Sequence, residues 1–311
     1  MAECNWFGKC ALILLIGIVL IGVSLLFSFT TLVNRFSSGY REALINDCQA
    51  LPEINYSTTI TYPSTPGIYE FSTAKALLDT ALKTTQSNCF NIIPIEAPQG
   101  FTKQHRMIGI NPWNNEPSMF AIVFTDDDAS RCIISFTGTM KVAEWMNDIN
   151  LVQTDSSILN NHIIGSKVHS GFYHIYLAVR QQIWELLSTF TNLKELYITG
   201  HSLGGALSTL CAFDFAHHNP IHYSFASPRV GNVIFADRYN QILPTGLRIY
   251  NIDDTVPSLP PPVILKWVYK HVNSGVAFDA NLGNIEKNHI QAYQEFIPRC
   301  VPSRGDCDDH N

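Results

Sequence analysis

The chain has 311 residues, of which 15% are charged and 46% are hydrophobic, and its formal net charge is −6. This acidic balance argues against a nucleic-acid-binding protein, which needs a basic surface. The composition also differs from that of disordered, collagen-like and coiled-coil chains. What remains is a globular protein with an unusually uncharged surface, or a protein with part of its chain in a membrane.

An apolar segment lies near the N-terminus. Residues 11–33 carry no charged side chain, and a helix of that length rises about 34 Å, enough to cross a hydrocarbon core of ~30 Å. We predict an uncleaved transmembrane or signal-anchor helix, because the apolar run is long and no small-residue cleavage pattern follows it. A cleaved signal peptide is the alternative. Both interpretations send the remaining chain into the secretory pathway, on the lumenal or extracellular side of a membrane or as a secreted protein.

The apolar segment at residues 11–33 does not explain the scarcity of charge, because the rest of the chain is still only about 16% charged.

The cysteines fit an oxidising compartment. Two disulfides are expected among Cys48, Cys89, Cys300 and Cys307, with three connectivities open. Cys132 and Cys211 fall inside an expected strand and helix, so we predict buried free thiols there. No Cys-x-x-Cys or paired-histidine spacing indicates zinc, and we predict no metal site.

Helical and β-type patterns alternate along the chain. Helices are predicted at 72–85, 172–190, 204–217 and 235–243, and strands at 119–124, 131–136, 195–199, 221–225 and 247–251. Three aspartates at 126–128 fit a hairpin turn better than a calcium loop, since the ligand spacing of a calcium loop is absent. The alternation predicts one α/β domain with a mostly parallel central sheet and helices on both faces.

The sharpest motif is Gly200-His201-Ser202-Leu203-Gly204, which lies between a predicted strand and a predicted helix. A G-x-S-x-G sequence at a strand-to-helix turn places its serine on a strained elbow with the hydroxyl above the sheet. Glycines on either side let the strand and the helix approach closely. Ser202 is therefore a candidate nucleophile.

A serine nucleophile needs a base and an acid that orients the base, in the chain order serine, acid, histidine. Asp253 and Asp254 directly follow the strand at 247–251, at the sheet edge where α/β active sites gather. His271 and His289 come later. Spacing alone does not decide whether Asp253 or Asp254 is the acid, or whether His271 or His289 is the base.

At this point the sequence resembles the class 3 lipases, a fungal-lipase-like branch of the α/β-hydrolases. The resemblance covers roughly residues 70–297 and rests on six segments in the family's order. They are Phe136–Thr139, Val168–Phe172, Gly200–Gly205, Phe225–Asn232, Asn251–Pro257 with Leu259–Pro261, and Tyr269–Val272, the last of which resembles an edge strand preceding the catalytic histidine.

The resemblance implies a Ser202–Asp254–His289 triad, because the family's acid directly precedes an x-Val-Pro sequence and its histidine opens a His-x-x-x-Tyr-like segment. His201 and His271 are then structural. Thr139 and the backbone N–H of Leu203 would form the oxyanion hole, and no metal or cofactor is needed. Two positions depart from the family pattern: Thr137 stands where arginine is usual, and Ala226 where glycine is usual.

A candidate lid follows Thr139 directly. Within residues 140–149, four apolar residues repeat at helical spacing, namely Val142, Trp145, Met146 and Ile149. An ordinary core-facing helix has the same pattern. The family resemblance favours a lid, since members carry one here with a matching tryptophan.

These observations predict five segments: a short tail (1–10), the transmembrane or signal anchor (11–33), a stalk (34–66), a lipase-like catalytic domain (67–299) and a polar C-terminal tail (300–311). The expected partner is a lipid ester substrate at a membrane or lipid-droplet interface, with no nucleic acid, and the N-terminal helix would attach the chain to the membrane. The alternatives are an inactive membrane-tethered binding module, an esterase or phospholipase of the same fold acting on another ester, and a serine peptidase.

Overall fold

The computed structural model describes residues 68–88, 95–139, 151–273 and 275–299. These residues all belong to one compact unit of the chain, Glu53–Asn311. The predicted anchor, stalk and C-terminal tail, the four lid residues Val142, Trp145, Met146 and Ile149, and Cys48, Cys89, Cys300 and Cys307 lie outside the described residues. Within the described ranges, no helix is both long and apolar enough to cross a membrane.

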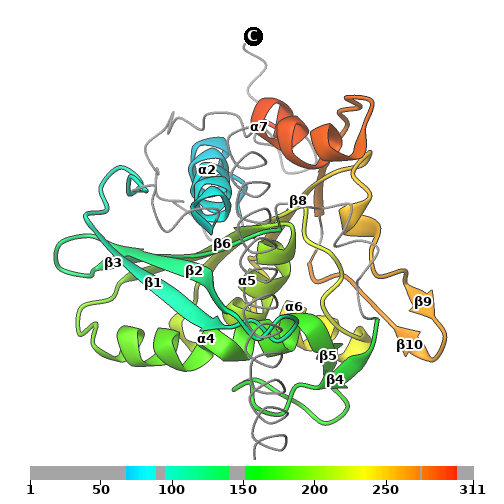
Figure 1. Ribbon diagram of the computed structural model, residues 1–311, viewed down its shortest axis with the longest axis horizontal. Coiled ribbons are helices and arrows are strands. Elements are labelled where there is room, and N and C mark those ends of the chain that lie inside the picture. Colours follow the sequence, from blue (N-terminus) through cyan, green and yellow to red (C-terminus); the bar gives the residue numbers. More distant parts are fainter. Residues whose placement is uncertain (1–67, 89–94, 140–150, 274, 300–311) are drawn as a thin grey trace, which may run out of the picture. The chain divides into compact units, whose positions relative to one another are not determined.

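A seven-stranded sheet forms the centre of the domain, in the order β1-β2-β3-β6-β7-β8-β11 (Figure 1). The strands from β3 to β11 run parallel, and β1 and β2 are antiparallel at one edge. The mostly parallel α/β sheet expected from the sequence is therefore confirmed. The strands are β1 (Lys103–Ile110), β2 (Pro117–Thr125), β3 (Arg131–Phe136), β6 (Glu195–His201), β7 (Ile221–Phe225), β8 (Leu247–Asn251) and β11 (Gly275–Phe278).

Helices cover both faces of this sheet (Figure 1). On one face α2 (Phe71–Asn88) and α7 (Ala292–Phe296) share a buried apolar cluster with alternate strand residues such as Ile133 and Tyr197. On the other face α4 (Ser170–Ser188), α5 (Leu203–Asp214) and α6 (Val233–Ile242) pack on the residues of opposite parity, such as Ile134 and Ile198. Because successive side chains of a strand point to opposite faces of the sheet, each strand contributes to both buried apolar clusters.

The buried cysteines behave as expected: Cys132 and Cys211 are buried free thiols in β3 and α5. The hairpin turn predicted between 125 and 131 is also present. There the Asp126 carboxylate accepts from the Arg131 guanidinium at 2.9 Å and the Ser130 hydroxyl at 2.8 Å, while Asp127 accepts from the Thr102 hydroxyl at 2.6 Å. These aspartate side chains stabilise the turn itself.

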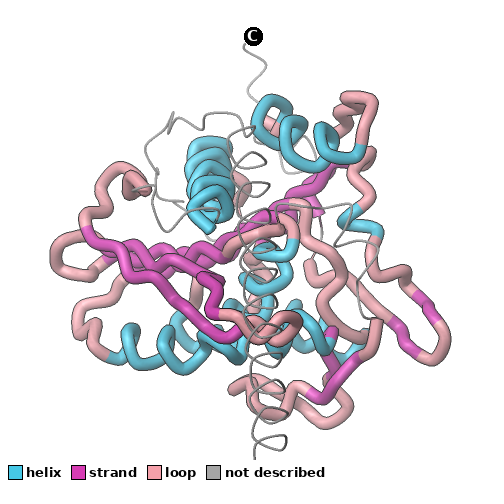
Figure 2. Tube along the Cα trace, viewed as in Figure 1, coloured by secondary structure: helices cyan, strands magenta, loops and turns pink. Residues whose placement is uncertain are grey.

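Residues 269–272 do not form the edge strand that we expected. The Tyr269 amide donates to the Pro262 carbonyl, and Lys270 makes one isolated bridge with Gly231. The edge of the sheet is β11, a few residues later, which pairs in parallel with β8. The chain between β8 and α7 is mostly loop (Figure 2). It contains a small hairpin of β9 (Val263–Ile264) and β10 (Trp267–Val268); a second one, β4 (Gln153–Asp155) with β5 (Lys167–His169), precedes α4.

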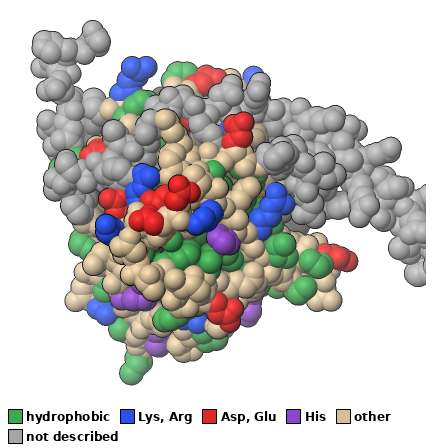
Figure 3. Space-filling model, turned by 90° about the vertical axis from the view of Figure 1, so that its left-hand side faces the viewer, with side chains coloured by type: hydrophobic (Ala, Val, Ile, Leu, Met, Phe, Trp, Pro, Cys, Tyr) green, Lys and Arg blue, Asp and Glu red, His purple; other side chains and the backbone are tan. Residues whose placement is uncertain are grey.

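The surface reflects the low charge of the sequence. On the face drawn in Figure 3, acidic and basic side chains are mixed and stand among uncharged atoms. Ion pairs on the described surface are few and local, as between Arg131 and Asp126 or Lys270 and Asp237. The scarcity of charge is thus a property of the folded domain.

Among the described glycines, the closest approach to backbone atoms joins β6 to α5. A Cβ atom added to Gly200 would lie 2.1 Å from the Gly204 carbonyl oxygen, and one added to Gly204 would lie 2.5 Å from the Phe136 carbonyl oxygen. Only glycine fits both positions, because backbone atoms cannot yield as a flexible side chain can. The two outer glycines of the motif therefore have a steric role in bringing β3, β6 and α5 together.

We predict that Gly200→Ala destabilises the domain by about 3 kcal/mol or more, since the new methyl group overlaps fixed backbone. The matched control is Gly283→Ala, where φ is +84° but no atom lies within 4 Å of the added Cβ; its cost should be about 1–2 kcal/mol. Chemical denaturation measures both variants. Equal stability losses for the two would contradict the steric account.

Candidate active site

Ser202 lies at the turn between β6 and α5, as the motif predicts. Its backbone has φ 60° and ψ −127°, a conformation that non-glycine residues rarely adopt, and its amide donates to the Phe225 carbonyl of β7 at 2.9 Å. Ser202 is also the N-cap residue of α5, yet its hydroxyl makes no capping hydrogen bond. Serine at an N-cap ordinarily uses its hydroxyl for the helix, so here the strained turn leaves Oγ available for another partner.

The end of β3 lies beside this elbow. Phe136 pairs with Gly200 across the parallel strands, and a Cβ added to Gly138 would lie 3.5 Å from the Ser202 Cβ. Thr139 follows directly. The Gly138 amide donates to the hydroxyl of Thr85 on α2 at 2.7 Å, and that hydroxyl in turn donates to the Ala81 carbonyl at 2.9 Å. Thr85 therefore holds the strand end that carries Thr139, a role that no sequence pattern signals.

The structure brings Asp254 and His289 together. The His289 Nδ1 lies 2.8 Å from Asp254 Oδ2, and both side chains are fully buried. Asp254 also accepts from the Val256 amide at 3.0 Å and from the Tyr293 hydroxyl at 2.8 Å. Because Nδ1 faces the acid, Nε2 is the ring nitrogen left for a reacting group. Asp253, the other candidate, contacts the Asn281 side chain at 3.4 Å instead.

Tyr293 is a second residue that the sequence reasoning did not assign. A π-helical turn, Lys287–Gln291, carries His289 and leads into α7, which carries Tyr293. Burial, with the Asp254 carboxylate as a further cause, raises the pKa of Tyr293 well above its ordinary value, so the phenol stays protonated and donates. The Asn251 amide donates to the same phenol oxygen at 3.0 Å. Tyr293 thus holds the Asp254 carboxylate in addition to the Val256 amide.

The two histidines interpreted as structural are both held by backbone carbonyls. His201 Nε2 donates to the His289 carbonyl at 2.8 Å, and burial followed by the neighbouring His289 places the pKa of His201 well below its ordinary value. His271 Nε2 donates to the Pro257 carbonyl at 2.8 Å, and burial with Arg248 and Arg229 lowers its pKa to about 3. Both rings are neutral and each gives its Nε2 to a backbone carbonyl, whereas His289 pairs with a carboxylate and keeps a buried Nε2 without a partner among the described residues.

Three buried polar atoms at this edge have no hydrogen-bond partner among the described residues. They are Ser202 Oγ, His289 Nε2 and Thr139 Oγ1. A buried group of this kind costs about 1–3 kcal/mol when left unsatisfied. Other such atoms occur elsewhere in the domain, but here they belong to three residues of the predicted site. The arrangement suits a site that completes its hydrogen bonds with a substrate.

The two departures from the family pattern have structural counterparts. Thr137 is buried, and its amide donates to the Phe120 carbonyl at 3.0 Å, so no charge needs a partner at that position. Ala226 has φ 50°, the left-handed region that favours glycine. Alanine therefore carries backbone strain at the position where the family usually has glycine.

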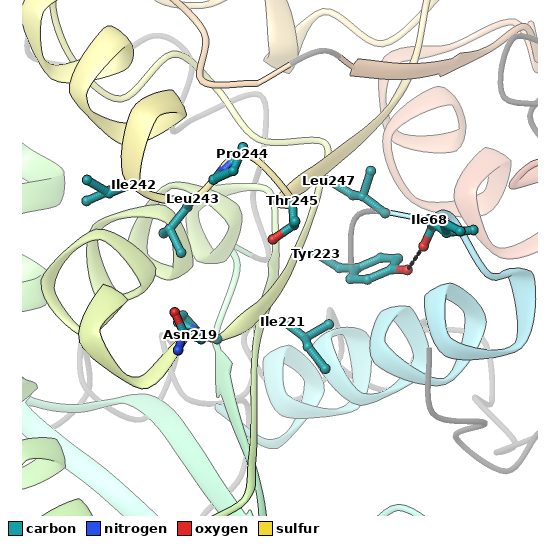
Figure 4. Close-up of a pocket in the computed structure, with 10 residues that line it drawn as sticks. Ile68, Asn219, Ile221, Tyr223, Ile242, Leu243, Pro244, Thr245 and Leu247 are labelled. Atoms are coloured by element: carbon teal, nitrogen blue, oxygen red, sulfur yellow. Dashed lines mark hydrogen bonds between the residues drawn. The ribbon is translucent and has the colours of Figure 1, made fainter. Parts of the chain in front are cut away.

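Among the described residues, no group of histidine, cysteine, aspartate or glutamate side chains could hold a metal ion. A separate cavity of about 280 Å³ lies at the amino ends of the neighbouring strands β7 and β8 (Figure 4). It is lined by residues at the starts of β7 and β8, such as Ile221, Tyr223 and Leu247. Ser202 and Asp254 lie at or beyond the carboxyl ends of their strands, so this cavity is not part of the candidate site.

The parallel sheet and the sharp turn at Ser202 between β6 and α5 are typical of the α/β-hydrolase fold. Residues 133–264 match the family described as "Lipase (class 3)". The chain is 30% identical over 181 residues to secreted mono- and diacylglycerol lipase 1 of Fusarium solani. This match covers 54% of this chain and 50% of that protein. It is 29% identical over 191 residues to the chloroplastic galactolipase DONGLE of Arabidopsis thaliana, covering 49% and 41%.

The solved structure of a mono- and diacylglycerol lipase from Aspergillus oryzae superposes with a TM-score of 0.54 at 22% identity, over 70% of this chain and 82% of that one. The fold is therefore the same. The sequence matches span about half the length of the curated relatives, or somewhat less.

The Thr85 contact yields a prediction. Thr85→Val removes the acceptor for the Gly138 amide while keeping the side-chain shape, so Thr139 loses its fixed position. We expect the labelling rate of Ser202 by a fluorophosphonate to fall roughly tenfold, less than the loss of a whole oxyanion donor. Thr85→Ser keeps the hydroxyl and should label at nearly the original rate. A Val variant as fast as the Ser variant, at equal thermal stability, would contradict the role of Thr85.

Proposed function

We propose that this chain is a serine hydrolase that cleaves the carboxylic ester bonds of acylglycerol lipids. The single observation that carries the proposal is the state of the two reactive atoms. Ser202 Oγ and His289 Nε2 are both buried and without a partner among the described residues, while Asp254 holds the other face of the imidazole. The match of residues 133–264 to the class 3 lipase family supports the same chemistry.

In the proposed mechanism Ser202 Oγ attacks the ester carbonyl, and His289 Nε2 takes the serine proton as the bond forms. Asp254 keeps the imidazole in the tautomer with its proton on Nδ1 and stabilises the positive charge that develops. The imidazolium then donates its proton to the leaving alcohol. A water molecule, deprotonated by the same histidine, hydrolyses the acyl-enzyme and frees the fatty acid.

The negative charge on the carbonyl oxygen needs donors that are in place before the reaction. We assign this role to the backbone N–H of Leu203 and to Thr139, through its backbone and its hydroxyl. Leu203 is the first residue of α5, whose N-terminus favours negative charge. Thr139 Oγ1 is one of the partnerless buried atoms. Thr85 keeps the strand end at the required distance from the elbow.

The relatives differ in the lipids that their names state: mono- and diacylglycerols in the Fusarium protein and galactolipids in the Arabidopsis protein. An acylglycerol is the proposed substrate class here, acted on at a membrane or lipid-droplet surface, and the ester of a polar membrane lipid is the second candidate. We further propose that residues 140–149 form a lid, whose apolar residues Val142, Trp145, Met146 and Ile149 would cover the pocket in water and turn toward lipid at an interface.

The proposed location is the secretory pathway. The apolar segment at residues 11–33 supports attachment to a membrane by one helix, with the catalytic domain on the lumenal or extracellular side. Secretion after cleavage is the alternative, and the secreted Fusarium relative supports export in either form.

The first test is Ser202→Ala. We expect hydrolysis of emulsified triacylglycerol, diacylglycerol and phospholipid to fall by roughly 10⁴-fold or more, because the nucleophile is lost. Circular dichroism and the unfolding midpoint should stay close to those of the original chain. Ser208→Ala, a buried serine on the same helix, is the matched control and should keep its activity. A folded Ser202→Ala protein with full esterase activity refutes the assignment, and an original chain active only on peptides indicates a peptidase.

The lid is tested by Trp145→Ala. Activity on emulsified long-chain esters should fall about tenfold, because the apolar face loses its largest group, while activity on a soluble short-chain ester stays within about twofold. Both assays use the same preparation of the full chain. Equal changes on the two substrates would mean that the segment is an ordinary core helix.

A further inference from the structure

The β9–β10 hairpin exposes an unusual amount of apolar surface. Val263 is 67% exposed, Leu265 is 93% exposed and Val268 is 44% exposed. Ile264 pairs with Trp267, so Leu265 and Lys266 form a two-residue turn at the tip. In Figure 1 the hairpin stands away from the central sheet, on the right-hand side. Apolar side chains thus occupy the most solvent-exposed position of this element.

Leu265 is costly at that tip for a second reason. Its φ is 52°, the left-handed region in which two-residue hairpin turns ordinarily place glycine, asparagine or aspartate. A leucine there adds backbone strain to the cost of exposing a large apolar side chain. Neither cost is recovered by packing within the described residues, since the side chain is almost wholly exposed. A binding partner beyond the described residues would cover this side chain and offset both costs.

The charges around the tip indicate what that partner is. The Lys266 ammonium lies 4.8 Å from the centre of the Trp267 ring, and the Lys167 ammonium of β5 lies 5.8 Å from it. Neither lysine forms an ion pair with a described residue, on a chain whose net charge is −6. At a lipid interface, apolar side chains enter the hydrocarbon, tryptophan lies at the boundary, and lysines extend their apolar stems so that the ammonium groups reach the headgroups. Leu265, Trp267 and the two lysines fit this arrangement, and the lysines add attraction to anionic headgroups.

The hairpin is fixed to the rest of the site at its base. The Gln153 amide donates to the Val268 carbonyl at 2.8 Å, and the Tyr269 amide donates to the Pro262 carbonyl at 2.8 Å. Arg229 donates through its backbone to the Leu259 carbonyl at 2.7 Å and through its guanidinium to the Pro260 carbonyl at 2.8 Å. The hairpin therefore continues, without a free linker, from the loop that begins at Asp254.

From these observations we propose that the β9–β10 hairpin is a docking element that inserts Val263, Leu265 and Val268 into an anionic lipid surface, with the half-buried Trp267 at its boundary. Lys167 and Lys266 lie at the level of the headgroups. A second copy of the chain does not suit this surface, because a symmetric contact would bring the lysines of both copies together. The inference rests on the hairpin alone and does not require that the chain hydrolyse lipids.

The test uses the full chain carrying Ser202→Ala, so that the vesicles stay intact, and measures quenching of tryptophan fluorescence by nitroxide-labelled phospholipids. Subtracting the signal of the same chain with Trp267→Phe isolates Trp267, because the other tryptophans contribute equally to both. We expect Trp267 to be quenched in vesicles of phosphatidylcholine with phosphatidylglycerol. Lys266→Gln should weaken lipid binding, so the lipid concentration that gives half-maximal quenching should rise about fivefold.

The decisive variant is Leu265→Asp, which should abolish the Trp267 quenching, whereas Ile110→Asp, at a 53% exposed position on β1, should leave it intact. Quenching that is absent in the parent chain, or that persists in Leu265→Asp, overturns the proposal. A dimer that Leu265→Asp disrupts, without Trp267 quenching, would assign the surface to a second copy. Because the catalytic serine is absent throughout, these outcomes are separate from those that test hydrolysis.

Discussion

The site depends on one backbone constraint, the strained conformation of Ser202. With φ at 60° and ψ at −127°, Ser202 is the single residue between the end of β6 and the start of α5. Isolated, such a conformation costs on the order of 1–3 kcal/mol. It persists because β6 is hydrogen-bonded on both sides by β3 and β7, and because Gly200 and Gly204 allow contacts that no other residue permits.

That constraint has chemical consequences. The strained turn withholds the hydroxyl of Ser202 from capping α5, and it brings the ends of β3, β6 and β7 to one edge. The loop after β8 then needs only to place Asp254, and the π-helical turn to place His289, at the same edge. Three histidines lie near the elbow or the acid loop, but the carbonyls of His289 and Pro257 occupy His201 and His271. Burial keeps both of those rings neutral.

Much of this could be predicted from the sequence where the signal is local. The strands Ile221–Phe225 and Leu247–Asn251 are found at the predicted residues, because short β-branched and aromatic runs are bounded by clear breaks. The elbow was predictable since its glycines and serine are adjacent in the chain. By contrast β1 was missed: its sequence Lys-Gln-His-Arg is polar, as befits an exposed edge strand, and only its second half alternates. The family pattern, rather than local spacing, separated Asp254 from Asp253.

The contacts that could not be predicted join distant parts of the chain. Thr85 lies 53 residues before Gly138, and Tyr293 lies 39 residues after Asp254. Thr85 carries no sequence signal, and the His-x-x-x-Tyr-like segment that contains Tyr293 does not show which residue the tyrosine hydroxyl contacts. The expected edge strand at 269–272 was displaced by the bridge of Lys270 to Gly231, another long-range pairing. The same limit applies to the β9–β10 hairpin, for which the sequence predicted no element.

The central claim is that Ser202, His289, Thr139 and Leu203 act on one carbonyl group. The most direct measurement is a crystal structure of the full chain after reaction with a lipid-like fluorophosphonate. The account predicts phosphorus bonded to Ser202 Oγ, with the phosphoryl oxygen within hydrogen-bond distance of the Leu203 amide and of Thr139, and His289 Nε2 beside the adduct. A reagent bonded to another residue, or a phosphoryl oxygen directed away from Thr139 and Leu203, would contradict it.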